Sequence, residues 1–247
     1  MTTIFEKPSI LVVAGHIGDF VWRSGGAIAR YAQEGSAIKL IIVSDGLRGE
    51  ANDYWKTEGA NAEEGLKRRR AEGAEAARIL GVEEAEFWGL PDYPMTGADG
   101  CVEKLAHEIR EFRPNLIITH SAFDAFNPDH NTVHQLVQKA HAAATGAGFR
   151  DGLEVSPRQT PIFGFEPHIT EISEFKPVVY VDITEVFEIK SRAMKVFSTQ
   201  PGMYAAYKRK AEVRANEASG RGSRPGCKYA EAFSIYHPIA ASGGFVW

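Results

Sequence analysis

A histidine and an aspartate follow directly on an apolar run near the start of the chain. The run ILVVA at 10–14 leads through a glycine into His16, and Asp19 comes three residues later. One turn of chain can bring an imidazole and a carboxylate at this spacing together around a cation. A nicotinamide-binding turn would show G-x-G-x-x-G instead, and GHIGDFVWRSGG does not fit that pattern. We therefore interpret His16 and Asp19 as metal ligands.

A second polar cluster follows a later apolar run, NLIITH at 115–120. The next stretch reads SAFDAFNPDHNTVH, in which Pro128, Asp129 and His130 open a predicted helix. His16, Asp19 and His130 would give a cation three ligands and an open position, which is the arrangement of catalytic zinc sites. Mixed nitrogen and oxygen ligands also accept iron, manganese or cobalt. Zinc is the first candidate, with these metals as alternatives.

Each predicted ligand also has a purely structural explanation. His16 can cap a helix, Asp19 can interact with a helix dipole, and His130 can lie on the surface. Their joint position at the ends of two predicted strands favours the metal site over these separate explanations. Two more histidines stay outside the predicted ligand set: His134, one helical turn after His130, and His120, which ends its strand and could touch a substrate.

Strand-length apolar runs alternate with segments of helical periodicity along most of the chain. The predicted strands are 10–14, 38–44, 85–89, 115–120, 161–166 and 178–183, and the helices between them are 21–35, 62–81, 102–112 and 131–144. This pattern predicts a single α/β domain over 1–247, with a Rossmann-like, mostly parallel sheet and helices on both faces. Helices at about 184–198 and 203–219, followed by YAEAFSIY, form a C-terminal elaboration. Such sheets bind ligands beyond the carboxyl ends of their strands, where both polar clusters lie.

The composition excludes several classes of partner. With 24% charged residues and a formal net charge of -4, the 247 residues lack the basic excess of a nucleic-acid-binding protein. Cys101 and Cys227 indicate neither a disulfide framework nor a CxxC zinc site, which favours the reducing cytoplasm. No signal-peptide core opens the sequence and no apolar run approaches about 20 residues, so we expect no membrane partner. The apolar tail GGFVW at 243–247 could dock on a second copy in a homo-oligomer or fold back onto its own core.

Several short motifs resemble the LmbE-like (PIG-L) zinc deacetylases over most of the chain. They are GHIGD and the glycine-containing helix after it, RGE, RRAEGAEAARILGV, GLPD and PDH. The family motif A-H-P-D-D-E aligns with 15–20, which retains the ligands His16 and Asp19 and puts Gly18 where the family has its catalytic base. The later H-P-D-H motif aligns with 127–130; it retains the ligand His130 but puts Asn127 in place of an acid or oxyanion-stabilising histidine. Amide hydrolysis needs a group that activates water and a group that protonates the departing nitrogen. These departures argue against ordinary deacetylation.

One branch of this family is similar in more detail. The opening HxGDFVWRxGGAIA, the RGE motif and the FEPH segment look like the branch that hydrates 4-oxalomesaconate (4-carboxy-2-hydroxymuconate) in gallate and protocatechuate catabolism. Those enzymes add water across an activated double bond of a tricarboxylate. The resemblance implies a zinc-dependent hydro-lyase that acts on a small anionic carboxylate and gives 4-carboxy-4-hydroxy-2-oxoadipate.

Hydration needs a base and a proton donor, and we assign roles in it to three residues; a replacement base is needed near Gly18, and the role of His168 rests mainly on the resemblance. Glu50, in SDGLRGE, would be the general base that activates water; the alternatives are an ordinary loop carboxylate or a group that holds a ligand histidine. His168, in GFEPH, would donate the proton, although a loop histidine is often structural. Asp129 would orient a ligand imidazole or bound water, or else cap the helix that it opens.

A tricarboxylate also requires positive charge, and guanidinium groups bind carboxylates through paired hydrogen bonds. Arg48, in the loop of Glu50, and Arg23, near the first motif, are the first candidates, and Asn127 is predicted to bind substrate with them. Four other arginines are further candidates: Arg69, Arg70, Arg221 and Arg224.

Two other functions compete with hydration. One is an N-acyl amide hydrolase, of the N-acetylglucosamine type, that uses Glu50 or Asp129 in place of the missing aspartate. The other is an inactive LmbE-like module that binds metal or sugar, since the loss of two catalytic groups is what such a module would show. If the protein is an enzyme, Glu50, Asp129 and His168 should converge on the metal. If it is a binding module, they need not.

Overall fold

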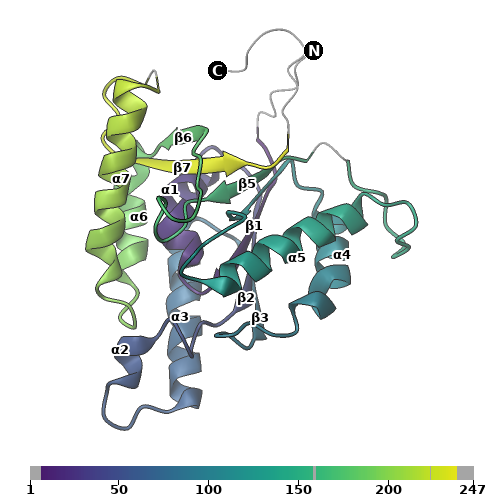
Figure 1. Ribbon diagram of the computed structural model, residues 1–247, viewed down its shortest axis with the longest axis horizontal. Helices are drawn as coiled ribbons and strands as arrows, with labels where there is room; N and C mark the ends of the chain where they lie inside the picture. The colour runs from purple at the N-terminus through teal and green to yellow at the C-terminus, as the bar shows by residue number, and fades with distance from the viewer. Residues whose placement is uncertain (1–6, 158–159, 223, 238–247) are drawn as a thin grey trace.

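In the described residues, seven strands form one sheet at the centre of the molecule (Figure 1). The computed structural model describes residues 7–157, 160–222 and 224–237. The order across the sheet is β3-β2-β1-β4-β5-β7-β6. The strands are β1 (Ile10–His16), β2 (Ile38–Ser44), β3 (Glu84–Leu90), β4 (Leu116–His120), β5 (Ile162–Phe165), β6 (Val179–Asp182) and β7 (Ala230–Ile235). This architecture confirms the predicted α/β class with a mostly parallel sheet.

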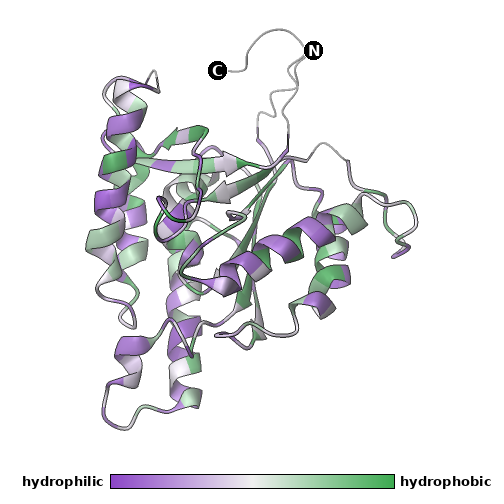
Figure 2. Cartoon of the chain, viewed as in Figure 1, coloured by the Kyte–Doolittle hydropathy of each residue, from purple (hydrophilic) through white to green (hydrophobic). Residues whose placement is uncertain are grey.

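Helices cover both faces of the sheet. They are α1 (Asp19–Gln33), α2 (Asn52–Trp55), α3 (Ala62–Leu80), α4 (Val102–Phe112), α5 (Pro128–Ala144), α6 (Phe187–Lys195) and α7 (Met203–Gly220), with short 3-10 turns η1 (Ala98–Cys101) and η2 (Thr184–Val186). Successive residues of a strand point to opposite faces, which gives the sheet two apolar cores. Val12 and Ala14 of β1 pack with α1, α3, α6 and α7, whereas Leu11 and Val13 pack with α4 and α5. Figure 2 shows hydrophobic residues gathered on the central strands and polar residues along the outer sides of the helices.

The C-terminal part differs from the prediction in one respect. The predicted C-terminal elaboration is not helical throughout, because YAEAFSIY contains β7, which pairs antiparallel with both β5 and β6 and joins the sheet. After a strand, a single helix brings the chain back to the edge of the sheet where that strand began, so the next strand runs parallel to it. Here α6 and α7 both follow β6, so the chain reverses once more and β7 runs in the opposite direction.

The strand order reverses between β1 and β4, which lie side by side. At such a switch point the loops after the two strands diverge and leave a crevice for a ligand. β1 ends at His16 and β4 ends at His120. The two polar clusters of the sequence therefore meet at one place.

Some other sequence predictions bear on the surface of the molecule. In the described ranges no helix combines the length and apolarity that crossing a membrane requires. Cys101 and Cys227 are both unpaired. The tail at 243–247, predicted to dock on a second copy or fold back, lies outside the described residues.

Candidate active site

Local backbone geometry brings the first and second motifs together. Gly18, just before α1, has a φ of 115°, a left-handed value that L side chains rarely adopt. This turn lets the chain leave β1 and begin α1 at Asp19, whose Oδ2 accepts a hydrogen bond of 2.8 Å from His16 N. At the end of the β4 loop, Asn127 Oδ1 accepts a hydrogen bond from Asp129 N and caps α5. Both helices therefore begin beside the crevice.

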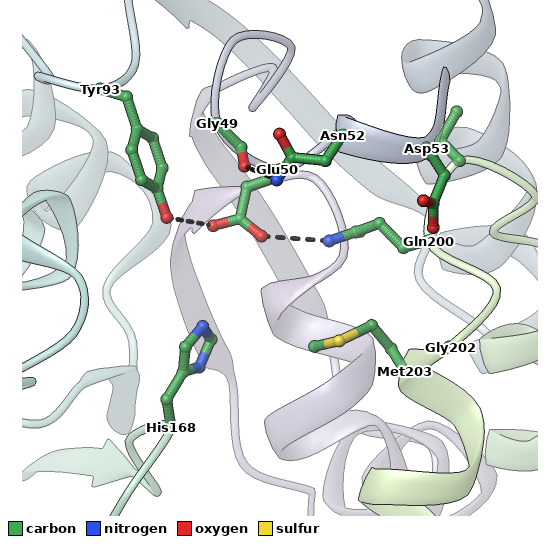
Figure 3. A pocket seen from close by; sticks show the side chains of 10 residues that line it. Gly49, Glu50, Asn52, Asp53, Tyr93, His168, Gln200, Gly202 and Met203 are labelled. Atoms are coloured by element: carbon green, nitrogen blue, oxygen red, sulfur yellow. Dashed lines mark hydrogen bonds between the residues drawn. The ribbon is translucent and has the colours of Figure 1, made fainter. Parts of the chain in front are cut away.

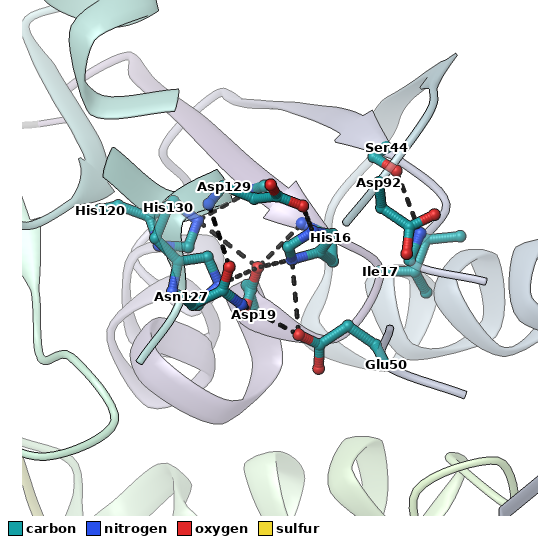
Figure 4. A network of polar contacts seen from close by, with 12 residues as sticks. His16, Ile17, Asp19, Ser44, Glu50, Asp92, His120, Asn127, Asp129 and His130 are labelled. Atoms are coloured by element: carbon teal, nitrogen blue, oxygen red, sulfur yellow. Dashed lines mark hydrogen bonds and ion pairs between the residues drawn. The ribbon is translucent and has the colours of Figure 1, made fainter. Parts of the chain in front are cut away.

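The three predicted ligands lie together in this crevice (Figure 4). Asp19 Oδ2 is 3.4 Å from His16 Nδ1 and 3.4 Å from His130 Nε2. All three side chains are buried. Two ligands of a tetrahedral zinc ion lie about 3.4 Å apart when each bond is about 2.1 Å long. The spacing of these atoms thus fits a small divalent cation.

Carboxylates fix which nitrogen of each imidazole faces the crevice. His16 Nε2 donates to Asp129 Oδ2 at 3.1 Å, and His130 Nδ1 donates to Asp124 Oδ2 at 3.0 Å. The other nitrogens, Nδ1 of His16 and Nε2 of His130, then carry lone pairs, as metal ligation requires. Among the described residues His16 Nδ1 is buried without a hydrogen-bond partner, whereas Asn127 Nδ2 lies 3.0 Å from His130 Nε2. A buried nitrogen without a hydrogen-bond partner, next to a carboxylate, is the arrangement expected of a metal-binding site.

The electrostatics of the site favour a cation in the same place. Burial alone would lower the pKa of His16, but the hydrogen bond to Asp129 and the negative charges of Asp19 and Glu50 raise it to about 10. Burial alone would raise the pKa of Asp19, but the neighbouring imidazoles hold it well below its usual range. Negative charge therefore dominates the crevice and draws a proton onto His16, a proton that a bound cation would replace.

His120 also lies in this cluster, although it stays outside the predicted ligand set. Its Nε2 is 3.4 Å from Asp19 Oδ2 and accepts a hydrogen bond of 2.8 Å from Gly15 N. Its ring stacks on His130, with 4.0 Å between the ring centroids. Asp19, His120 and His130 also have ligand atoms within 4.8 Å of one another, but a backbone N–H already occupies the Nε2 lone pair of His120, so its contacts favour a supporting role beside His130. His134 contacts the backbone oxygen of His120 through Nδ1 and takes no part in the cluster.

Glu50 lies beside the predicted ligands. Its Oε1 is 3.7 Å from His16 Nδ1, and Glu50, His16 and His130 can bring ligand atoms within 4.8 Å of one another. The carboxylate also lines a cavity of about 300 Å³ together with Tyr93 and His168 (Figure 3). Burial alone would raise the pKa of Glu50, but the charge of His16 holds it below its usual value. An ionised carboxylate thus faces a space large enough for a small substrate.

His168 lies on the same cavity as a neutral imidazole. Its ring is edge-on to that of His130, with 5.4 Å between centroids. Burial, with the charges of Arg23 and His130, lowers the pKa of His168 to about 4. The Arg23 guanidinium donates to His168 Nδ1, so the proton of the neutral ring is on Nε2. The predicted proton donor is therefore placed to donate a hydrogen bond from Nε2, and not to act as an imidazolium.

Arg23 has a different environment from the one that its predicted role requires. Its side chain is fully buried, and it contacts Asp19 Oδ1, Glu166 O and His168 Nδ1. Binding a substrate carboxylate would require the guanidinium to leave these partners. The position does not support a role in substrate binding and instead makes Arg23 a support for Asp19 and His168.

The other predicted arginines lie around the cavity and not on it. Arg48 is exposed, contacts Tyr93 O at 3.4 Å and lines an adjoining hollow of about 570 Å³ with Trp55 and Asp92. Its role in binding substrate stays a prediction. Of the four further arginines, none lines the cavity of Glu50: Arg69 is buried against Gln200 and Asp45, Arg70 pairs with Asp45, Arg224 pairs with Asp182, and Arg221 follows the end of α7.

Asn127 takes one of the two roles considered for Asp129, the capping of α5. Asp129 accepts hydrogen bonds from His16 Nε2, Tyr93 N and Met95 N, so it orients an imidazole as expected. The alternative in which Asp129 caps α5 is wrong, because Asn127 is the cap. Asn127 is fully buried and its Nδ2 donates to Glu50 Oε1, so it contacts the predicted base more directly than the cavity.

Three residues of the site were not found from the sequence. Asp124 holds His130 and accepts from His168 N, and a carboxylate behind each ligand histidine could have been sought in DAFNPDH. Tyr93, just after the GLPD motif, donates to Glu50 Oε1 at 2.8 Å. Gln200 donates to Glu50 Oε2 at 3.0 Å from the α6–α7 loop, where no motif marks it.

Comparisons with known proteins agree with this geometry. The family model of PIG-L, described as GlcNAc-PI de-N-acetylase, matches residues 11–141. The 4-oxalmesaconate hydratase of Pseudomonas putida is 36% identical over 94% of this chain and 90% of that protein. A 1D-myo-inositol 2-acetamido-2-deoxy-alpha-D-glucopyranoside deacetylase of Rhodococcus erythropolis is 28% identical over 77% of this chain and 80% of that protein.

Solved structures give the same relationship. The crystal structure of GalB, the 4-carboxy-2-hydroxymuconate hydratase of Pseudomonas putida, superposes with a TM-score of 0.91 at 33% identity and covers 96% of this chain and 100% of that one. The N,N'-diacetylchitobiose deacetylase of Pyrococcus horikoshii has a TM-score of 0.75 at 23% identity, covers 93% and 84%, and shows the shared fold alone. From the family-model match over residues 11–141 and the similarity to a relative along nearly its whole length, the chain belongs to the PIG-L family.

Proposed function

We propose that this protein is a zinc-dependent hydratase that adds water to 4-oxalomesaconate (4-carboxy-2-hydroxymuconate) and gives 4-carboxy-4-hydroxy-2-oxoadipate. The relatives with 36% sequence identity and with a TM-score of 0.91 are both named as hydratases of this substrate. The deacetylases among the compared proteins are less similar, at 28% identity or with a TM-score of 0.75. Gallate degradation in the cytoplasm is the setting that this reaction implies, and the two unpaired cysteines are compatible with it.

The observation that carries the proposal is the position of the Glu50 carboxylate. Gly18 occupies the place of the deacetylase base, and its φ of 115° disfavours any side chain there. Glu50, from a different loop, has its Oε1 3.7 Å from His16 Nδ1 and faces the cavity. Asn127 occupies the place of the family's acidic histidine, and it cannot protonate a leaving amine. The site therefore keeps the ligands of the family with another arrangement of proton-transfer groups.

The side chains of this site can perform water addition without a leaving group. Glu50 takes a proton from water as the water oxygen bonds to the alkene carbon, and the electron pair of the double bond moves toward the conjugated carbonyl. His168 Nε2–H would donate a hydrogen bond to the oxygen on which this charge develops. The proton on Glu50 then returns to the neighbouring carbon. His16, Asp19 and His130 would hold the cation, which supplies Lewis-acid polarisation when bound.

The experiment measures two reactions of one preparation. Purified protein, assayed with and without added zinc, is given the unsaturated tricarboxylate and an N-acetylglucosaminide. We expect loss of the absorbance of the conjugated substrate and no release of acetate. Glu50→Gln should retain the metal and lose at least about 100-fold in turnover, whereas Glu58→Gln, an exposed carboxylate outside the cavity, should behave as the wild type.

Each other outcome selects a different function. Acetate release without hydration would make the protein an amide hydrolase. Zinc binding without either reaction would make it a binding module. Whether the protein works as a homo-oligomer is a separate prediction that light scattering of the purified chain tests.

A further inference from the structure

Three donors from three separate loops hold the carboxylate of Glu50. Tyr93 Oη and Asn127 Nδ2 donate to Oε1 at 2.8 and 3.1 Å, and Gln200 Nε2 donates to Oε2 at 3.0 Å. Figure 3 shows Tyr93 and Gln200 approaching the carboxylate from opposite sides of the cavity. Tyr93 follows β3, Asn127 precedes α5 and Gln200 lies between α6 and α7. The position of Glu50 thus depends on segments far apart in the sequence.

The orientation of the Gln200 amide is determined by Arg69. Arg69 Nη1 donates to Gln200 Oε1 at 2.9 Å, and an arginine has only donors. The amide oxygen must therefore face Arg69, which leaves Nε2 to face Glu50. Arg69 is itself fully buried and donates to Asp45 O at 3.1 Å and to Thr199 Oγ1 at 3.2 Å. Arg69, which was a further candidate for substrate binding, therefore orients the side chain of Gln200 instead.

The orientation of the Tyr93 hydroxyl is determined in a similar way. Asn127 Nδ2 donates to Tyr93 Oη at 2.8 Å, so the hydroxyl proton is directed to Glu50 Oε1. The backbone of Tyr93 is fixed as well, because its N–H donates to Asp129 Oδ2 at 2.9 Å. The carboxylate that orients His16 therefore also places the tyrosine that holds the base.

We propose that Tyr93 and Gln200 are positioning residues, which hold the Glu50 carboxylate so that its Oε2 takes the proton from water. This proposal rests on the hydratase function proposed above. Each carboxylate oxygen has two lone pairs. Those of Oε1 are filled by Tyr93 and Asn127, whereas Oε2 has the single donor Gln200 among the described residues. The lone pair of Glu50 that is left without a donor is consequently on Oε2. Loss of either donor lets the carboxylate rotate without touching the metal ligands.

The test compares two conservative variants in two backgrounds. Tyr93→Phe and Gln200→Leu should each lower kcat about 10- to 100-fold, because small misplacements of a base cost this much, while KM stays within about threefold and zinc content is unchanged. In a Glu50→Gln background the same substitutions should change kcat less than about twofold, because they act through Glu50. If turnover of Glu50→Gln is below detection, the crystal structures described below decide the positioning role.

Matched controls separate positioning from general damage. Tyr180→Phe removes a hydroxyl that donates to another glutamate, Glu217 Oε2 at 3.0 Å, and Gln135→Leu changes an exposed glutamine. Both should leave kcat and KM as in the wild type. Equal losses from Tyr93→Phe or Gln200→Leu in the wild-type and Glu50→Gln backgrounds would overturn the proposal, as would an unchanged kcat in the wild-type background.

A structural readout keeps the inference separate from the function on which it rests. If the wild type fails to hydrate any unsaturated tricarboxylate, the proposed function falls. Crystal structures of Tyr93→Phe and Gln200→Leu then decide the positioning role on their own. We expect the Glu50 carboxylate to rotate away from its wild-type position, and an unmoved carboxylate in both variants would overturn the inference.

Discussion

His16 and Asp129 are joined by a hydrogen bond of 3.1 Å between Nε2 and Oδ2, and this bond turns the free nitrogen of His16 toward Asp19. Asp129 also accepts two backbone N–H groups from the loop after β3, at 2.9 and 2.7 Å. One carboxylate therefore fixes both the tautomer of a predicted ligand and the loop that carries Tyr93. The supports of the predicted ligands are built into the fold, and each can be tested separately.

Asp129→Asn should weaken zinc binding about 10- to 100-fold, because the ligand ring loses the charged acceptor that orients it and makes it more basic. Competition with a chromophoric chelator measures the affinity. Asp151→Asn is the matched control, since Asp151 lies 3.2 Å from an imidazole nitrogen of His107 outside the site, and it should bind zinc as the wild type does. Equal affinity of Asp129→Asn and the wild type would show that Asp129 has no orienting role.

Removal of the cation should lower the melting temperature of the wild type, because a ligand that binds only the folded state stabilises it by about 4 kcal/mol at 1,000 times its dissociation constant. Differential scanning calorimetry with a chelator and with added zinc measures this difference. In His130→Ala the melting temperature should no longer respond to zinc. His107→Ala, which changes a histidine away from the cluster, should respond as the wild type does.

Gly18→Asp restores the aspartate of the deacetylase motif but should not restore deacetylation. A side chain at a φ of 115° is strained, and its Cβ would lie 2.7 Å from Trp22 Nε1. We expect a loss of about 1–3 kcal/mol in the free energy of unfolding and no release of acetate. Gly100→Asp, at a position with open space around it, should leave urea unfolding unchanged. Acetate release by Gly18→Asp would show that the lost base alone separates the two reactions.

The sequence predicts the parts of this molecule that depend on local patterns. Continuous apolar runs and helical periodicity are enough to place β1 to β6 and the main helices, and the strand ends are enough to bring His16 and His130 together. The contact of Gln200 with Glu50 and the burial of the Arg23 side chain against His168 depend on how distant segments pack, which no local pattern encodes. β7 was not predicted as a strand of the sheet, and its antiparallel direction follows from the pair of helices before it.

Gly49→Ala should lower turnover at least about 10-fold through Tyr93, because small shifts near a catalytic group are costly. A Cβ on Gly49 would lie 2.1 Å from Tyr93 Cδ2, so the ring that holds Glu50 must move. In a Tyr93→Ala background this contact is absent, and Gly49→Ala should cause no further loss of kcat. Gly148→Ala, which meets no neighbour within 4 Å, should have no effect in either background. Additive losses would mean that Gly49 acts on the site by another route.

Glu166→Gln should destabilise the protein near neutral pH and less so in acid. Burial alone would raise the pKa of Glu166, but hydrogen bonds from Arg214 hold it below its ordinary value of 4.5. A carboxyl whose pKa is depressed by folding stabilises the native state above its unfolded pKa, and this contribution is lost as the pH falls through the folded value. We expect a difference of about 2 kcal/mol in urea unfolding at pH 7 that shrinks steadily below about pH 4.5. Glu154→Gln, an exposed partner of Arg113, should match the wild type throughout. A gap that stays constant with pH would mean that Glu166 stabilises the fold by packing and not by its charge.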